Sequence, residues 1–451
     1  MTTSAIRETR HLSQSSCPQP EKTGWIERFF DLSAKGTSIK QESMAGVTTF
    51  LTMAYIIFVN PQILSAAGMD AQAVFVTTCL IAAIGSIAMG VFANLPIAMA
   101  PAMGLNSYFA FFLVGSMGLA WQTGMAVIFW GSLLFAIAAP FRAYIITSIP
   151  TSLRVGIATG CGLFIALIGL HNAHIIVGHP ATMVTIGNPR SAEFVLGCLG
   201  FLMMVGLVHR GFKAAVVVSI ASITLIGLAI GDVQYTGIAS MPPSIAPVVG
   251  QLDYMGALDM SLFGVILSVM LVSLFESAGT FIAVTDKAGL TDSTGNYPNA
   301  TKSLYIDSLG SAGGAFMGTS SICPYIESAT GVVDGGRSGL MAVVVGILFL
   351  LAIFFSPLAG MIPAYATAGA LIYVGLLMTA DLTKVNWDDF TESVPAFAAT
   401  IMIPFSFTLT EGIATGFIAY TFMKIVSGRY KEISPVCALL TVVFLLRYAF
   451  L

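Results

Sequence analysis

The sequence predicts an all-α polytopic membrane protein with fourteen membrane segments, arranged as two inverted repeats of seven. Three observations support this fold class: the composition, a series of long apolar stretches, and a similarity between the two halves of the chain. Of the 451 residues, 56% are hydrophobic and only 9% are charged, and the mean hydropathy is +0.89. A soluble protein needs more polar surface than this, so we expect most of the chain to lie in a lipid bilayer.

Fourteen apolar segments can be placed along the chain. Two of them, residues 95–113 and 320–334, are interrupted by prolines and glycines, including Pro101 and Gly104 in the first and Pro324 in the second. The other twelve are predicted to be helices that cross the membrane. They cover residues 43–64, 73–92, 122–141, 152–170, 193–209, 213–231, 261–284, 302–318, 338–356, 362–380, 391–408 and 410–427.

The regions outside these segments predict the orientation. Residues 1–42 are polar and lack the apolar stretch of a secretion signal, which predicts a retained cytoplasmic tail. With the N-terminus inside, the outer loops hold only Arg190, and the acidic loop at 232–260 lies outside, as the positive-inside rule requires. Residues 428–451 form a C-terminal tail, and their apolar part, 436–451, could be a surface helix or a further span.

The two halves of the chain resemble each other. Residues 124–140 align with 339–357, allowing small gaps, and the Gly-Ser pair at 85–86 matches the Gly-Ser pair at 310–311. The same alignment places the two broken segments opposite each other.

Each repeat contains an odd number of segments, which sets its orientation. The first repeat covers residues 43–231 and the second 261–427. Because seven is odd, the second copy must lie upside down relative to the first. In such inverted repeats, paired broken helices mark a substrate site near the middle of the membrane.

Few acidic residues fall within the predicted spans, and Glu411 lies near the end of one. The others are Glu276, Asp307 and Glu327. A charge at this depth costs about 3 kcal/mol, and no Lys or Arg lies beside them in the sequence to offset that cost. We therefore expect a functional role for Glu276 and Glu327, with a buried structural hydrogen bond as the alternative. Removal from water favours the protonated carboxyl group, so such a residue could carry a proton. Asp307 could bind the substrate or support the broken helix that follows it.

Polar and aromatic residues near the breaks complete the candidate site. Asn106 offers an acceptor and two donors on one planar amide, which suits the edge of a heterocycle, although an interhelical hydrogen bond is the alternative. Phe109, Phe275 and Tyr325 could stack on a planar ligand or could simply pack in the bundle.

Other site types receive little support. The six cysteines include no CxxC pair, and the histidines at 171, 174 and 179 lie in a predicted loop without a neighbouring acid, so we expect neither a metal nor a cofactor. Phosphate-binding glycine motifs are lacking as well. No nucleophile–base pair or metal motif lies at membrane depth, which disfavours a membrane enzyme, and a channel would not need paired broken helices. We expect no nucleic-acid partner.

Several motifs, read in order, resemble the purine permeases of the AzgA-like branch of the nucleobase:cation symporters, the nucleobase–ascorbate transporter family, and are most similar to those of bacterial adenine permeases. The resemblance runs from about Gly36 to the C-terminus. The motifs lie at residues 36–42, 48–64, 100–106, 275–280, 325–328 and 391–397.

The resemblance implies a division of the fold into a core domain, segments one to four and eight to eleven, and a gate domain, segments five to seven and twelve to fourteen. It also implies a short strand in each of the broken segments three and ten. By motif, Asn106, Glu276 and Glu327 match the family's substrate-site residues, and Asp307 matches an acid that supports the site. Many relatives have Asp at the position of Glu276.

The function implied is proton-coupled uptake of purine nucleobases, adenine in particular, across the inner or plasma membrane. Glu276 would couple the base to the proton, and Glu327 and Asn106 would fix the base. Hypoxanthine or guanine is the alternative substrate, followed by uracil, xanthine or an anion. Transport would follow an elevator mechanism, with the glycines at 156, 160, 162, 369 and 375 on the surface between core and gate. Relatives are often dimers, which leaves a homodimer open.

Overall fold

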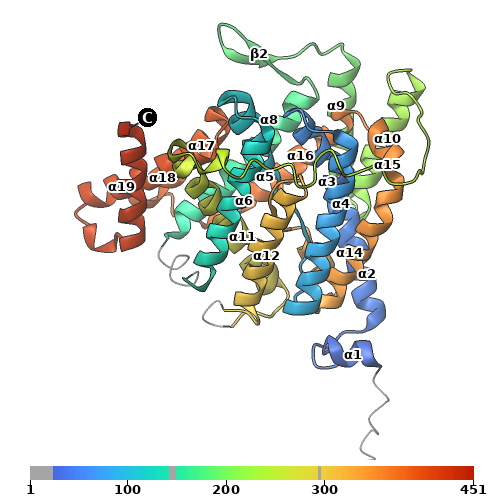
Figure 1. Ribbon diagram of the computed structural model, residues 1–451, viewed down its shortest axis with the longest axis horizontal. Helices are drawn as coiled ribbons and strands as arrows, with labels where there is room; N and C mark the ends of the chain where they lie inside the picture. Colours follow the sequence, from blue (N-terminus) through green and yellow to red (C-terminus); the bar gives the residue numbers. More distant parts are fainter. Residues whose placement is uncertain (1–23, 142–148, 293–295, 451) are drawn as a thin grey trace, which may run out of the picture.

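Helices build almost the whole molecule and run roughly side by side (Figure 1). The computed structural model describes residues 24–141, 149–292 and 296–450. Most of the predicted N-terminal tail therefore lies outside the described residues, but the tail's last part contains a short helix, α1 (Trp25–Phe29), before the bundle begins.

The first repeat contains the elements expected from the sequence. Its first predicted span is two helices, α2 and α3, with a break at Ala54 and Tyr55. Its broken segment begins with a strand, β1, and ends in a π-helical stretch. The elements are α2 (Ile39–Met53), α3 (Ile56–Ser65), α4 (Ala71–Ala88), η1 (Met89–Ala93), β1 (Met99–Pro101), α5 (Met103–Ser107), η2 (Tyr108–Ser116), α6 (Trp121–Ala138), η3 (Ala139–Phe141), α8 (Thr151–Asn172), β2 (Ile176–His179), β3 (Met183–Ile186), α9 (Ala192–His209) and α10 (Ala215–Ala229).

The second repeat has the same plan, and one further helix, α19, follows it. The broken segment again consists of a strand, β4, and a short helix, α13. The elements are η4 (Gly256–Leu258), η5 (Met260–Leu262), α11 (Phe263–Lys287), α12 (Ala300–Phe316), β4 (Ile322–Pro324), α13 (Ser328–Val333), α14 (Gly339–Ala352), η6 (Ile353–Phe355), α15 (Ser356–Met361), α16 (Ala364–Thr379), η7 (Ala380–Lys384), α17 (Phe390–Ser406), α18 (Leu409–Val426), η8 (Tyr430–Glu432) and α19 (Pro435–Phe450).

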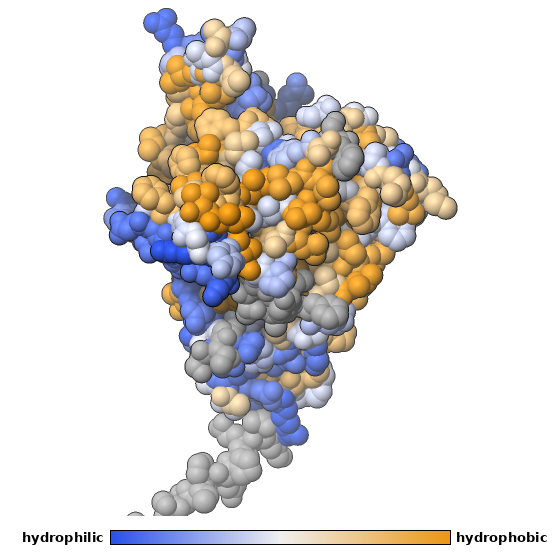
Figure 2. Space-filling view, turned by 90° about the vertical axis from the view of Figure 1, so that its left-hand side faces the viewer, coloured by the Kyte–Doolittle hydropathy of each residue, from blue (hydrophilic) through white to orange (hydrophobic). Residues whose placement is uncertain are grey.

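Length and hydropathy support a membrane-spanning bundle. Within the described part of the chain, eight helical stretches are long and apolar enough to cross a membrane. The remaining predicted segments are shorter, are broken as predicted or, in the 18-residue helix α18, are less apolar. Figure 2 views the molecule from the side of α19 and shows hydrophobic residues over much of the middle of this face, with hydrophilic residues gathered toward its lower end.

The similarity between the two halves is reproduced in the packing. Helix α6 packs against α11 and α12, and its counterpart α14 packs against α2 and α4. Small residues allow the close approach in both places. A Cβ at Gly131 of α6 would lie 2.7 Å from Val269 of α11, and a Cβ at Gly46 of α2 would lie 2.8 Å from Val344 of α14. The fourth segment of each repeat therefore packs against the first two segments of the other repeat.

The helices pack in two groups. One group contains α2, α3, α4, α6, α11, α12 and α14, and the other contains α8, α9, α10, α16, α17 and α18. These are the helices that the resemblance assigns to the core and to the gate, and we use "core group" and "gate group" for these two sets.

The expectation for the glycines of α8 and α16 is wrong. Gly156 and Gly160 contact Ala396 and Ile403 of α17, and Gly162 of α8 contacts Gly375 of α16. Gly369 contacts α9 in the same way. All these contacts lie inside the gate group. Helices that cross at short distance within one group also need small residues, so a glycine does not by itself indicate a surface between two groups.

A hairpin in the loop after α8 was also not predicted from the sequence. Strands β2 and β3 pair antiparallel, with Ile176 opposite Ile186, and the hairpin projects from the end of the bundle (Figure 1). Next to it, His174 Nδ1 lies 3.1 Å from Glu193 Oε2, so the cluster's acidic neighbour comes from α9. Among the described residues no group of three metal-ligating side chains occurs.

Candidate functional site

The two broken segments meet through their strands. Strands β1 and β4 pair antiparallel, with Ala100 opposite Cys323 at the centre. Beyond the strands, the backbone N–H of Ala102 donates to Ser321 O at 2.8 Å, and that of Tyr325 donates to Ala98 O at 3.0 Å. The pair of short strands implied by the resemblance is thus confirmed, and it brings residues more than 200 positions apart into one site.

A serine of the preceding helix holds each strand. Ser86 Oγ accepts from Met99 N at 2.9 Å and donates to Met99 O at 3.0 Å. Ser311 Oγ accepts from Ile322 N at 3.2 Å and donates to Ile322 O at 2.8 Å. These serines belong to the two matching Gly-Ser pairs, so the repeat in the sequence reflects a repeated contact.

Glu276 reaches this strand pair from the middle of α11. Its Oε1 lies 3.9 Å from Cys323 Sγ. A Cβ at Gly104 would lie 3.7 Å from the same oxygen, so the helix after β1 also borders the carboxyl group. Among the described residues, Glu276 Oε2 is buried without a hydrogen-bond partner. Glu276 therefore offers a free acceptor where the two broken segments cross.

Glu327 lies directly before α13 and is 6% exposed. The hydroxyl group of Tyr55, at the break between α2 and α3, donates to Glu327 Oε1 at 2.7 Å. This hydrogen bond restrains the Glu327 carboxyl group at one of its two oxygens.

Asn106 lies in α5 and is fully buried. Its Nδ2 donates to Asn60 Oδ1 of α3. Asn60 Nδ2 in turn donates to Thr78 Oγ1 at 2.7 Å and to Thr319 Oγ1 at 2.8 Å. Within the described part of the chain, Asn106 Oδ1 has no hydrogen-bond partner.

Asp307 is fully buried in α12, one helical turn before the Ser311 that holds β4. Residues four apart lie on the same face of a helix, so Asp307 faces the region of the strand pair. Its two proposed roles, ligand or support, remain predictions.

The aromatic candidates have different surroundings. Phe109 is fully buried, and a Cβ at Gly124 of α6 would lie 2.9 Å from its ring. The hydroxyl group of Tyr325 donates to Pro101 O at 2.7 Å and so ties β4 to β1. Phe275 is adjacent to Glu276 in α11, and its side chain lies outside the described residues. The stacking roles of these three residues stay predictions.

Sequence reasoning missed Tyr55, Asn60 and Cys323, which contact the candidate site residues. Polar side chains within the apolar run at 43–64 were a usable signal, because Asn60 precedes a proline inside a helix. Cys323 has no local signal beyond the Pro324 that follows it, and its place beside Glu276 depends on the pairing of β4 with β1.

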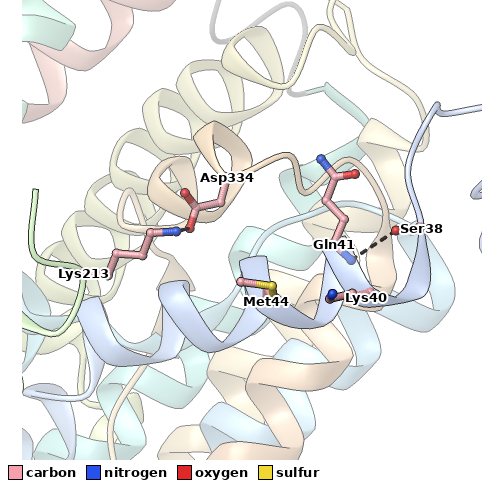
Figure 3. Close-up of a pocket in the computed structure, with 6 residues that line it drawn as sticks. All are labelled: Ser38, Lys40, Gln41, Met44, Lys213 and Asp334. Atoms are coloured by element: carbon pink, nitrogen blue, oxygen red, sulfur yellow. Dashed lines mark hydrogen bonds and ion pairs between the residues drawn. The ribbon is translucent and has the colours of Figure 1, made fainter.

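Among the described residues, polar side-chain contacts connect the core group and its broken segments to the gate group at three places. The first, an ion pair of 2.5 Å, borders a surface pocket next to α2 (Figure 3). The second joins α3 to α16 at 3.0 Å and the third joins η2 to α18 at 3.1 Å. The pairs are Lys213 with Asp334, Gln62 with Thr367, and Tyr108 with Thr410.

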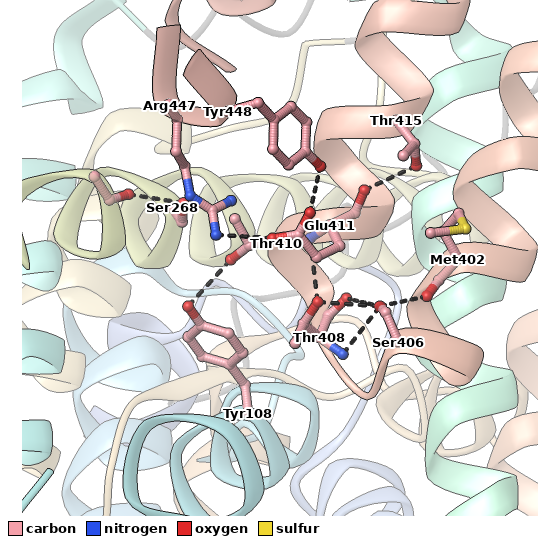
Figure 4. Close-up of polar contacts among 11 residues, drawn as sticks. Tyr108, Ser268, Met402, Ser406, Thr408, Thr410, Glu411, Thr415, Arg447 and Tyr448 are labelled. Atoms are coloured by element: carbon pink, nitrogen blue, oxygen red, sulfur yellow. Dashed lines mark hydrogen bonds and ion pairs between the residues drawn. The ribbon is translucent and has the colours of Figure 1, made fainter. Parts of the chain in front are cut away.

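The C-terminal helix α19 packs along α18. Thr441 lies 2.7 Å from Thr421, and Arg447 donates to Glu411 Oε1 at 2.8 Å. Tyr448 donates to the other oxygen of Glu411, which lies next to the contact of Thr410 with Tyr108 (Figure 4). The apolar end of the chain is therefore a helix attached to the gate group.

A bundle of fourteen segments in two inverted halves, with buried acids where its broken segments cross, is the architecture of a membrane transport protein. The family model Xan_ur_permease, described as the Permease family, matches residues 40–426. The chain belongs to this family.

The relatives and the solved structures agree with this assignment. The chain is 56% identical to the adenine permease AdeP of Escherichia coli, over 98% of this chain and 99% of AdeP. It is 41% identical to the guanine/hypoxanthine permease PbuG of Bacillus subtilis, over 94% of this chain and 100% of PbuG. The transmembrane domain of a cyanobacterium bicarbonate transporter, BicA, has the same fold with a TM-score of 0.61 and 15% identity, covering 83% of this chain and 96% of that domain. The resemblance to purine permeases is confirmed.

Proposed function

We propose that the protein takes up purine nucleobases across the cell membrane, that adenine is its preferred substrate, and that uptake is coupled to protons. The observation that carries this proposal is the convergence of Glu276, Glu327 and Asn106 on the crossing of β1 and β4. The 56% identity to the adenine permease AdeP supports adenine as the substrate.

The chemistry of these groups suits a purine. A purine presents adjacent N–H donors and ring-nitrogen acceptors along its edges. Carboxylate and amide oxygens accept from the N–H groups, and a protonated carboxyl group donates to a ring nitrogen. Glu327 and Asn106 would fix the position of the base, while Glu276 would bind the base and carry the proton.

Glu276 is the better proton carrier of the two acids. The Tyr55 hydroxyl donates to one oxygen of Glu327, whereas one oxygen of Glu276 lacks a partner among the described residues. Glu276 Oε2 can therefore hold a proton before the substrate binds. Binding and release of the base can then be linked to the proton.

Alternating access would move the core group against the gate group and carry the site across the membrane. Two packing groups with polar contacts between them support an elevator mechanism of this kind. In a background that keeps only the buried Cys323 of the native cysteines, a crosslink of Gln62→Cys to Thr367→Cys should then stop uptake. A crosslink of Thr421→Cys to Thr441→Cys, inside the gate group and its attached helix, is the matched control. Full uptake with the first pair crosslinked would contradict the mechanism.

Uptake of labelled adenine in cells that lack other purine permeases tests the function. Glu276→Gln should abolish concentrative uptake while the protein still reaches the membrane. Glu193→Gln, which removes a half-exposed carboxylate far along the chain from the site, should leave uptake unchanged. A protonophore should collapse uptake, whereas removal of sodium should not. Wild-type cells that accumulate no adenine would refute the proposal.

Hypoxanthine or guanine is the second candidate substrate, supported by the 41% identity to PbuG. Competition of adenine uptake by unlabelled purines separates the two candidates. An anion is disfavoured, since the two buried acids would repel it.

A further inference from the structure

Asn106 could in principle read either kind of purine edge. A planar amide can pair its oxygen with a 6-amino group, or after a flip of 180° can pair its NH2 group with a 6-oxo group. Discrimination between these two purine classes therefore requires something that fixes the amide. Asn60, which is not among the proposed substrate-contacting residues, can fix the amide of Asn106.

Two threonine hydroxyls orient the amide of Asn60, because a flipped amide would bring three oxygens together with only two hydroxyl hydrogens between them. Asn60 is fully buried in α3, and its Nδ2 donates to both Thr78 Oγ1 and Thr319 Oγ1, at 2.7 and 2.8 Å. The two threonine hydroxyls also lie 3.0 Å from each other, which makes a closed triangle of polar groups. Both hydrogens of the Asn60 amide are thus used, and only its Oδ1 remains to face Asn106.

The orientation of Asn106 follows from that of Asn60. Because Asn60 presents an acceptor, Asn106 must turn its NH2 group toward it, and the two are hydrogen-bonded. A flipped Asn106 would place two oxygens against each other in a fully buried position, at the cost of an unsatisfied hydrogen bond. Asn106 Oδ1 is consequently left as a buried acceptor without a partner among the described residues, as is Glu276 Oε2.

We propose that Asn60, held by Thr78 and Thr319, is a specificity-determining positioning residue that locks the Asn106 amide with its oxygen toward the substrate. An oxygen at this point requires an N–H group on the ligand, which a 6-amino purine supplies. A 6-oxo purine in the same pose would place its carbonyl oxygen against Asn106 Oδ1. This inference rests on the proposed function, since it assumes a purine in the site.

The experiment compares hydroxyl removal at neighbouring positions. Selectivity is measured as the ratio of the inhibition constants of hypoxanthine and adenine against labelled adenine uptake. Thr78→Val and Thr319→Val, alone and combined, free the Asn60 amide and should lower this ratio, by on the order of tenfold in the double variant. Thr78→Ser keeps the hydroxyl group and should restore the ratio.

Thr77→Val is the matched control. Thr77 is buried beside Thr78 in the same helix, but its hydroxyl group donates to Val74 O of its own helix at 3.1 Å. Its loss should leave the ratio unchanged. If a variant does not transport, the ratio is measured on the purified full chain from the shift in thermal stability that each purine produces.

The outcomes separate the two proposals. An unchanged ratio in the double variant, with adenine still bound, overturns the role of Asn60 and leaves the transport function intact. An equal fall of the ratio in Thr77→Val also overturns it, because the effect would then be general. A wild-type protein that neither takes up nor binds adenine refutes the proposed function itself.

Discussion

The two halves of the candidate site have the same backbone but different polar groups. In each half a serine holds a short strand, and a short helix follows the strand. The half from β1 and α5 presents an amide, Asn106, held by Asn60. The half from β4 and α13 presents a carboxylate, Glu327, held by Tyr55.

This difference shows how a symmetric fold can bind an asymmetric ligand. The inverted repeat fixes where the two half-sites lie, and that placement uses backbone pairing that any two similar sequences can form. A purine has unlike edges, so the side chains at equivalent places must differ. Both holding residues come from the first predicted span, which makes α3 and the break before it the source of the asymmetry.

The largest effect is expected when the acidic half is made to resemble the amide half. Glu327→Gln keeps the size of the side chain but removes the charge that strengthens its hydrogen bonds. We expect adenine uptake to fall by on the order of a hundredfold at equal protein level in the membrane. Initial uptake rates and an immunoblot measure this. Uptake within threefold of wild type would show that the charge of the second half is dispensable.

The reverse exchange should have a smaller but clear effect. Asn106→Asp removes the donor to Asn60 and sets two acceptors against each other in a fully buried place. We expect the apparent KM for adenine to rise by about tenfold to a hundredfold. The dependence of uptake on adenine concentration gives this value. A wild-type KM would mean that Asn106 acts only as packing.

Loss of the hydroxyl group that binds Glu327 should weaken substrate binding, with a smaller effect than the two changes above. Tyr55→Phe removes one hydrogen bond to a carboxylate and should raise the apparent KM by about tenfold. Tyr297→Phe is the control, because its buried hydroxyl group lies 3.2 Å from Ser303 at the start of α12. Equal effects of the two changes would argue against a specific role for Tyr55.

The smallest effect concerns the serines that the two halves share. Ser86→Ala and Ser311→Ala leave a buried backbone N–H unsatisfied and should each cost about 1–3 kcal/mol of stability. Ser311→Ala should cost more, because Ser311 Oγ also accepts from Ser321 at 2.9 Å. Thermal unfolding of the purified protein tests this order. Ser132→Ala, which breaks a bond only within α6, is the control and should cost less.

Much of the fold could be predicted from the sequence because the signals for it are local. Apolar length gave the spans, and prolines and glycines gave the two broken segments, whose strands lie at 99–101 and 322–324. The β2–β3 hairpin was missed because its exposed strands are four residues long and show no clear alternation. The glycines of α8 were placed wrongly because a small residue signals a close helix contact without naming the partner helix.

The sequence by itself determined the class of this protein, its fourteen segments, their inverted repeat and the cost of Glu276 and Glu327 in the membrane. These properties follow from hydropathy and charge, which each residue carries wherever it lies. Only the tertiary structure decided that Tyr55 holds Glu327, 272 positions away, and that Asn60 and Thr319 meet across 259 positions. Hydrogen bonds of this kind depend on how distant helices pack against each other, and no local pattern in the chain encodes that packing.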